Sequence, residues 1–205
     1  MLPARLSLLL ALLCAPASLP APYRQRQRPP VPQPSHTVRF SSDRLILLPS
    51  PDDQWTLANG CHGCPAGRVL WLANNVDHHR RIVRKYENTI AGAWSSDSAN
   101  FFVNDEPESG AVRAYVIEAA SLKVTEIEKL IVAADDAAPK LLRAHRAALA
   151  VERWRGPDEL LVALTGRVEE PTPTAFEVRY DVKLSGAVRR VSERTWEPEP
   201  DPPSH

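Results

Sequence analysis

The chain has 205 residues, with 25 Lys and Arg against 25 Asp and Glu, so its formal net charge is +0 at pH 7. A neutral chain lacks the positive excess that draws proteins to nucleic acid or to anionic membranes, so we expect neither as a partner. The length suits one domain of ordinary size, once the two ends described below are set aside.

Residues 1–17, MLPARLSLLLALLCAPA, have the pattern of a secretory signal peptide. Arg5 supplies the positive start, an apolar run follows, and small residues of a cleavage site end at Ala17. The apolar run is shorter than the roughly 20 residues that cross a bilayer, which argues against a permanent anchor. Cys14 suggests lipidation, but Leu13 before it is not the small residue that lipidation needs. We therefore expect a periplasmic or secreted protein with no membrane span after cleavage.

Residues 18–36 and 197–205 are both rich in proline. The first segment also interleaves Arg with Gln, and the second reads EPEPDPPSH and is acidic. Proline removes backbone donors and favours extended chain, so neither segment is expected to build a core. We predict a linker at residues 18–36 and a disordered tail at residues 197–205.

Between these ends, residues 37–196 contain a degenerate repeat of three units, at about residues 44–88, 89–132 and 149–196. Each unit has an apolar segment, a turn rich in Ser, Pro, Gly and Asp, and then further short alternating segments. Ser50 and Ser95, in the first two turns, are 45 positions apart. Four strands in about 40–45 residues are typical of propeller blades, so we predict an all-β domain of about three four-stranded antiparallel sheets.

Residues 133–148, AADDAAPKLLRAHRAA, are inserted between the second and third units. Asp135 or Asp136 can cap a helix there, Pro139 suits an early helical position, and Leu141, Leu142 and His145 share one side. This segment predicts a short helical insertion that covers an edge or an end of the sheets.

Two turns carry a resemblance to a known family. Residues 50–55 read SPDDQW and residues 94–97 read WSSD, which resemble the W-S-P-D-G turns of TolB-type β-propellers. The resemblance covers about residues 44–196 and implies a bacterial, often periplasmic, binding scaffold, although similar propellers cap some peptidases. The glycine after Asp is missing, and three units are fewer than the 4 to 8 blades of closed propellers. We therefore expect an incomplete or open propeller, or a homo-oligomer that completes a ring.

Loss of Cys14 with the signal peptide leaves Cys61 and Cys64, in the sequence CHGC. An isolated pair in an oxidising compartment most simply forms a disulfide. A thioredoxin-like redox pair would need its first Cys at a helix N-terminus, whereas this pair falls between strands. Covalent haem would need His where Pro65 stands.

A zinc site and a pair of free thiols remain alternatives for the same loop. Zinc needs further ligands, for which His62 or a second copy of the chain are candidates. His78 and His79 are expected at the other end of the following strand, roughly 20 Å from the cysteines, which is too far for one metal. We therefore assign no metal ligands from this chain alone.

Polar loops at matching places in the three units are expected to share one rim. His62 belongs to the first loop, Asn104, Asp105 and Glu106 form the second, and Glu169 and Glu170 belong to the third. Such a rim suits a cation or a basic partner, and solvated turns are the simpler interpretation. The acidic residues lack the spacing of a calcium-binding EF-hand.

Signatures of catalysis are absent from the sequence, which has no G-x-S-x-G, P-loop, H-E-x-x-H or dinucleotide-binding pattern. We therefore predict no cofactor and no enzymatic activity, and expect an exported interaction module whose partner is an envelope protein or peptide. The alternative function is a metal-binding or thiol-redox protein that uses the CHGC loop. A hydrolase on a propeller scaffold is a third class, suggested only by the habits of the family.

Overall fold

The computed structural model describes residues 37–40, 45–60, 68–107, 112–169 and 172–197. All of the described residues belong to one compact unit of the chain. Several predictions lie outside the described residues: those for residues 1–36, Cys61, His62, Cys64, Glu170 and residues 198–205.

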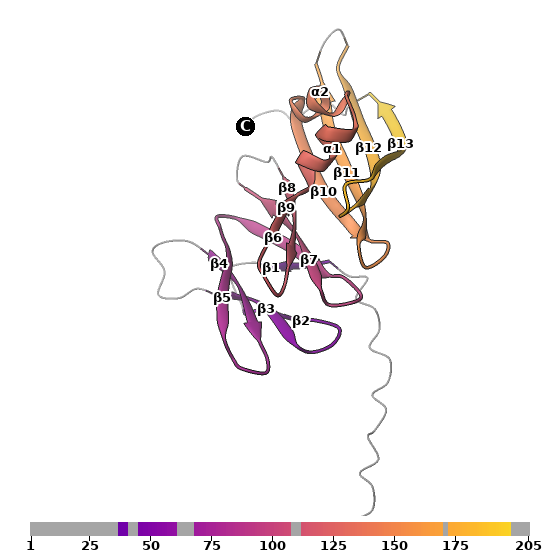
Figure 1. Ribbon diagram of the computed structural model, residues 1–205. Coiled ribbons are helices and arrows are strands. Elements are labelled where there is room, and N and C mark those ends of the chain that lie inside the picture. Colours follow the sequence, from indigo (N-terminus) through magenta and orange to yellow (C-terminus); the bar gives the residue numbers. More distant parts are fainter. Residues whose placement is uncertain (1–36, 41–44, 61–67, 108–111, 170–171, 198–205) are drawn as a thin grey trace, which may run out of the picture. The chain divides into compact units, whose positions relative to one another are not determined.

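The described chain consists mostly of strands, arranged in three antiparallel sheets (Figure 1). The first sheet contains β2 (Leu47–Pro49), β3 (Trp55–Gly60), β4 (Arg68–Asn74) and β5 (Arg80–Tyr86). The middle sheet contains, in spatial order, β1 (Val38–Phe40), β6 (Thr89–Trp94), β7 (Asn100–Glu106), β8 (Arg113–Glu118) and β9 (Val124–Glu126). The third sheet contains β10 (His145–Trp154), β11 (Glu159–Val168), β12 (Thr174–Lys183) and β13 (Val188–Trp196). The predicted all-β class, with three propeller-like sheets, is confirmed.

The middle sheet gains a fifth strand from the start of the described chain. β1 precedes the first sheet in sequence, yet it pairs with β6 of the middle sheet, with Val38 opposite Gly92 and Phe40 opposite Ile90. Phe40 is buried there, and β1 covers the edge of β6 that would otherwise be unpaired. The four-strand repeat did not include this strand.

The turns after β2 and β6 have the same hydrogen bonds, which explains the Ser-x-Asp pattern. The Ser50 hydroxyl donates to Asp52 at 2.6 Å and accepts from the Trp55 N–H at 3.0 Å. Ser95 repeats both bonds, to Asp97 at 2.6 Å and from the Asn100 N–H at 3.0 Å. A side chain that bonds its own turn in this way selects a tight connection between two strands.

The third turn lacks this serine and is one residue shorter. The Ser50 N–H donates to the carbonyl of Trp55, and the Ser95 N–H donates to that of Asn100. At the matching place, the Arg155 N–H donates to the carbonyl of Glu159. Trp55, Asn100 and Glu159 therefore mark equivalent positions at the starts of β3, β7 and β11.

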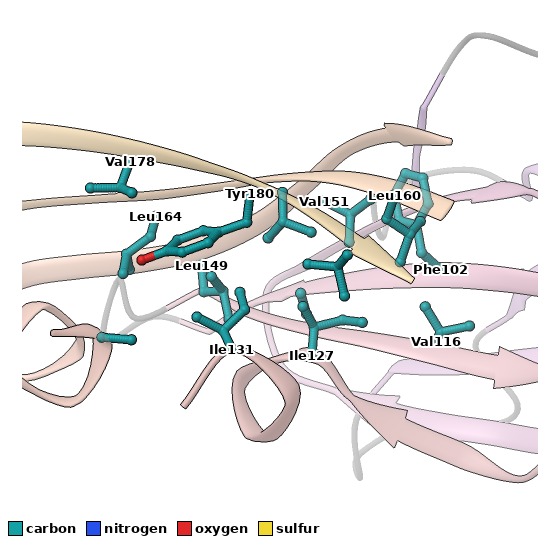
Figure 2. Packing of buried hydrophobic residues seen from close by; sticks show 14 of the residues in the cluster. Phe102, Val116, Ile127, Ile131, Leu149, Val151, Leu160, Leu164, Val178 and Tyr180 are labelled. Carbon is teal, nitrogen blue, oxygen red and sulfur yellow. The ribbon is translucent and has the colours of Figure 1, made fainter. Parts of the chain in front are cut away.

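Two apolar clusters hold the sheets face to face. Phe101 and Val103 of β7 join the cluster shared with the first sheet, which includes Leu57, Leu70 and Leu72. Because side chains alternate along a strand, Phe102 between them points to the opposite face. It joins the cluster with the third sheet and with the helix residues Ile127 and Ile131, and Figure 2 shows Ile131 beneath Leu149 and Tyr180.

Polar bonds join the same pairs of sheets. The indole N–H of Trp94, in the middle sheet, donates to the Leu48 carbonyl of the first sheet at 3.0 Å. The indole of Trp154, in the third sheet, likewise donates to the Ala93 carbonyl of the middle sheet at 3.1 Å. Each tryptophan is thus hydrogen-bonded to the sheet that precedes its own.

The helical insertion consists of α1 (Ile127–Ala134) and α2 (Ala138–Leu142), and so begins earlier than residue 133. It starts there because Ile127 and Ile131, one turn apart, are both buried against the sheets. Asp135 is the C-cap of α1, its carboxylate accepts from the Ala137 N–H at 3.0 Å just before α2, and His145 already belongs to β10. Among the described residues, no helix is both long enough and apolar enough to cross a bilayer.

Candidate functional site

An equivalent position in each of the three sheets carries an aromatic residue. The position lies opposite the residue that follows Trp55, Asn100 or Glu159 by three places. In the first sheet Ala58 pairs with Trp71, in the middle sheet Val103 pairs with Tyr115, and in the third sheet Val162 pairs with Tyr180.

In the third sheet, Tyr180 and Val162 belong to the cluster shared with the middle sheet. In the middle sheet, Val103 belongs to the cluster shared with the first sheet, and Tyr115 meets Arg84 of β5, whose guanidinium lies 4.2 Å from the ring centroid.

The equivalent residues of the first sheet face away from the other two sheets. Leu57, Leu70 and Leu72 are buried against the middle sheet, so Ala58 and Trp71, which alternate with them, point to the other side. No sheet precedes the first one within the described residues. The equivalent faces of the other two sheets are sheet interfaces. No described sheet packs against this face of the first sheet.

This face contains a groove with a volume of about 420 Å³. Its apolar part is formed by small and large side chains from β2, β3 and β4 and the residues beside them: Leu45, Leu47, Ala58, Gly60, Trp71 and Ala73. Its polar part is formed by Thr56, Asn59, Asn74, Asn75, His78 and Arg80. We refer to this set as the β2–β4 groove.

Glycine shapes the floor of the β2–β4 groove. A Cβ at Gly60 would lie 3.2 Å from the indole nitrogen of Trp71 and 3.5 Å from its Cδ1. The indole therefore lies over the Gly60 backbone, where a larger residue would displace it. The equivalent positions carry Asp105 and Leu164 in the other two sheets, so an open floor under the aromatic ring belongs to the first sheet.

Two leucines border the groove and are largely exposed. Leu45 and Leu47 are 67% and 59% exposed. Exposed leucines beside a tryptophan form an apolar patch, and such patches mark interaction sites more often than isolated apolar residues do.

The outer face of the third sheet carries ion pairs where the first sheet has an apolar groove. Arg179 forms ion pairs with Glu152 and Glu177, each at 3.0 Å. Asp181 pairs with both Arg155 and Arg189 at 2.7 Å. These ion pairs suit a solvated face, so the two outer faces of the three-sheet unit differ in character.

Hydrogen bonds fix the end of the groove next to the β4–β5 turn. The Thr56 hydroxyl donates to Asn75 Oδ1 at 3.0 Å, and Asn75 Nδ2 donates to the Asp53 carbonyl at 2.9 Å. Asn74 Oδ1 accepts from the Val76 N–H at 2.8 Å, which holds the turn. The amides of this border are thus occupied by the fold and position its apolar neighbours.

The described members of the predicted rim, Asn104, Asp105, Glu106 and Glu169, each have partners elsewhere in the fold. Asn104 is only 5% exposed. Its amide donates to the Val151 carbonyl and accepts from the Val151 N–H, both at 2.9 Å, so it joins the middle and third sheets. This placement corrects the expectation of a rim position: a buried side-chain amide must find partners inside the fold, and here the next strand supplies both.

The remaining described rim residues have separate partners. The Asp105 carboxylate accepts from Arg84 Nε at 2.7 Å, which ties the middle sheet to the first. Glu106 pairs with Arg39 at 3.4 Å, and Glu169 pairs with Arg167 at 3.1 Å. No hydrogen bond or ion pair found in the described chain links Glu169 to the acidic residues of β7.

Side chains with shifted pKa values lie outside the β2–β4 groove. Burial alone would raise the pKa of the Asp52 carboxyl, but hydrogen bonds from Ser50, Gln54 and Ser98 outweigh it and lower that pKa. Burial, together with the hydrogen bond to Asp135, raises the pKa of Tyr180 to about 12. Both groups are engaged in holding the fold.

No cluster of three or more His, Cys, Asp or Glu side chains suited to a metal ion occurs in the part of the chain that the structure describes. The CHGC loop lies outside that part, and its disulfide and zinc interpretations remain predictions.

Comparisons with known proteins give no family. The sequence matches no protein-family model and no curated protein. Among solved structures, the chain is similar to a prolyl endopeptidase studied for inter-domain dynamics in catalysis and specificity, at 12% identity and a TM-score of 0.34. The match covers 76% of this chain and only 27% of that one. A likeness this low carries no inference about activity.

Sequence reasoning missed the β2–β4 groove. In the sequence, Leu47 and Trp71 look like ordinary residues of alternating strands, and similar residues are buried in the other two units. The available signal was their place in the first of the three repeat units, which no described sheet precedes.

Proposed function

We propose that this chain is an exported, non-enzymatic interaction module that binds an extended segment of an envelope protein or peptide in the β2–β4 groove. The observation that carries the proposal is the position of Trp71. Its equivalents in the other sheets, Tyr115 and Tyr180, contact the neighbouring sheet, and Trp71 lines the β2–β4 groove on the corresponding face of the first sheet.

The energetics of the groove support binding by burial. Covering an exposed leucine side chain fully contributes about 1.5–3 kcal/mol, before the costs of association are subtracted, and covering the half-buried Trp71 adds the burial of its remaining exposed area. Leu45, Leu47 and Trp71 lie within one groove, so one extended segment can cover all three. Tryptophan is also prominent among the residues that dominate binding energies at interfaces.

The distribution of titratable groups supports binding over catalysis. Asp52 and Asp135, whose pKa values are lowered, and Tyr180, whose pKa is raised, are all bonded to other residues of the fold. His78 is the imidazole that borders the groove. Hydrolysis of a panel of ester and peptide substrates that disappears in His78→Ala would overturn the non-enzymatic part of the proposal.

The binding test begins with selection of short random peptides, displayed in a library, on the full chain. Titration calorimetry then compares the selected peptide with variants. Trp71→Ala should weaken binding by about tenfold or more, because a central tryptophan contributes about 2 kcal/mol or more. Leu47→Ser should weaken it in the same direction.

A matched control comes from the middle sheet. Val124 on β9 is 50% exposed, similar to Leu47, but lies outside the groove. Val124→Ser should leave the affinity unchanged, while circular dichroism confirms that all variants are folded. Selection of peptides whose affinity responds to Val124 and not to Trp71 would refute the groove as the binding site.

We also propose that the three sheets are related to the blades of TolB-type propellers. The matching hydrogen bonds of Ser50 and Ser95 support it, since they give the Ser-x-Asp pattern one structural role in two units. An experimental structure in which these two turns adopt different conformations would count against the relation.

Export and the cysteine pair can be tested in one measurement on protein recovered from the host's periplasm or medium. Intact mass should correspond to a chain that begins at Ser18, with no alkylation of Cys61 or Cys64 before reduction and two alkylated thiols after it. Retention of Met1 would contradict export. Thiols that react only after a chelator is added would favour the metal alternative.

A further inference from the structure

The polar end of the β2–β4 groove carries the guanidinium of Arg80 and the imidazole of His78. His78 and Arg80 border it next to the β4–β5 turn, and both are exposed. Neither side chain forms a hydrogen bond or an ion pair within the described residues. The carboxylate nearest in sequence, Asp77, accepts a hydrogen bond from the backbone N–H of His79 at 2.8 Å. An occupant of the groove therefore meets an apolar floor and positive charge at one end.

The chain contains a segment with complementary chemistry. Residues 197–205 read EPEPDPPSH, with three carboxylates, Glu197, Glu199 and Asp201, alternating with prolines. Proline restricts itself and the residue before it to extended backbone, so little conformational entropy remains to be lost on binding. Proline rings also pack well in grooves lined by aromatic residues, which is how many proline-rich segments are recognised.

We propose that the β2–β4 groove of one copy of the chain binds residues 197–205 of a second copy, with prolines against Trp71 and Leu47 and carboxylates toward Arg80 and His78. This inference rests on the proposed function, because it names an occupant for the same groove.

A second copy fits better than the same molecule. The described chain leaves the third sheet at Trp196, the end of β13, whereas the groove lies on the face of the first sheet turned away from the middle one. Packed sheets are about 10 Å apart, so the tail would have to pass around two sheets before reaching the groove. Nine extended residues span only about 30 Å.

The test measures self-association of the full chain by light scattering and sedimentation. The wild type should form dimers or larger species in a concentration-dependent manner. Trp71→Ala should weaken association at least tenfold, and Arg80→Glu at least threefold, with a smaller effect at high salt because exposed charges are screened. Arg113→Glu, which changes an exposed arginine of the middle sheet, is the matched control and should have no effect.

Charge reversal gives a second, independent readout. The triple variant Glu197→Lys, Glu199→Lys, Asp201→Lys should weaken association with wild type and restore it when mixed with Arg80→Glu. A photo-crosslinking residue in place of Pro200 should attach to residues 45–73 of another copy, which mixing of isotopically heavy and light chains distinguishes from attachment within one copy.

The outcomes separate this inference from the proposed function. A monomeric wild type, crosslinks within one copy only, or association that is insensitive to Trp71 and Arg80 would each overturn the inference. If selected peptides still require Trp71 in any of these cases, the groove remains a binding site for another partner. Loss of both results would refute the inference and the proposed function together.

Discussion

The hydroxyls of Ser50 and Ser95 show how one residue type produces a repeat. Each hydroxyl donates to an aspartate two residues later and accepts from a backbone N–H at the start of the next strand. Asp53 and Ser98, one residue after each aspartate, both adopt positive φ, at 59° and 63°. The Ser-x-Asp pattern could therefore be found in the sequence, because the residues that form the turn are adjacent.

Removing one hydroxyl tests this role. Ser95→Ala should lower the free energy of unfolding by about 1–3 kcal/mol, because a buried serine loses its bonds to Asp97 and to the Asn100 N–H. Ser96→Ala, at the exposed neighbouring position, should stay within about 0.5 kcal/mol of the wild type. Denaturant titration measures both, and equal effects would contradict the account.

Asp135 links the end of α1 to the third sheet. It accepts hydrogen bonds from Tyr180 at 2.8 Å and from Arg190 at 2.6 Å. Burial acts to raise the pKa of the Asp135 carboxyl, but these hydrogen bonds, with that of the Ala137 N–H, outweigh burial and lower that pKa. A carboxyl whose pKa is lowered by folding stabilises the fold at pH values above its pKa in the unfolded chain, near 3.8. That stabilisation is lost as the pH falls through the pKa of the folded state.

The corresponding prediction concerns Asp135→Asn. At pH 7 this variant should be less stable than the wild type by about 1.5–3 kcal/mol, the usual contribution of hydrogen bonds to a charged group. The difference should begin to shrink below about pH 4, where this carboxyl is protonated in the unfolded chain, and should be lost as the pH falls through the lower folded-state pKa. Urea titrations across this range measure it, with Asp136→Asn as the exposed control. A difference independent of pH would exclude the ionised carboxyl as the cause.

At the scale of elements, the pairing of β6 with β7 requires a glycine. A Cβ at Gly92 would lie 2.7 Å from the Phe102 carbonyl oxygen, closer than side-chain carbons approach backbone atoms. Gly156, in the turn before β11, has no such neighbour, since its nearest atom would be Glu159 Cβ at 3.9 Å. The two glycines therefore serve different purposes, although the sequence presents them alike.

Alanine substitutions distinguish them. Gly92→Ala should destabilise the chain by about 1–3 kcal/mol, because two paired strands must move apart. Gly156→Ala should be neutral or slightly stabilising, since it restricts the unfolded chain without a clash. Thermal unfolding of both variants checks the contrast, and a larger loss for Gly156→Ala would refute it.

The elements differ in how far the sequence could predict them. Alternation and turn residues predicted the three sheets, because both are local signals. The pairing of β1 with β6 could not be predicted, because Val38 and Gly92 are far apart in sequence and alternation does not name a partner. α1 was predicted to start too late, because the burial of Ile127 and Ile131 depends on the third sheet.

At the scale of the whole three-sheet unit, the candidate site depends on the order of stacking. Trp71, Tyr115 and Tyr180 hold equivalent positions, and only their place in the stack makes the first a groove residue and the third a core residue. No local pattern separates them, so the groove became visible only when each sheet's neighbours were known.

The most direct test of the binding face is hydroxyl-radical footprinting of the full chain, at a concentration where it is monomeric, with and without the peptide selected against it. We predict that peptide binding lowers oxidation of Trp71 and Leu47 while oxidation of Val124 and Trp196 stays constant. Unchanged oxidation of Trp71, or protection confined to the middle or third sheet, would contradict the assignment of the β2–β4 groove as the site of binding.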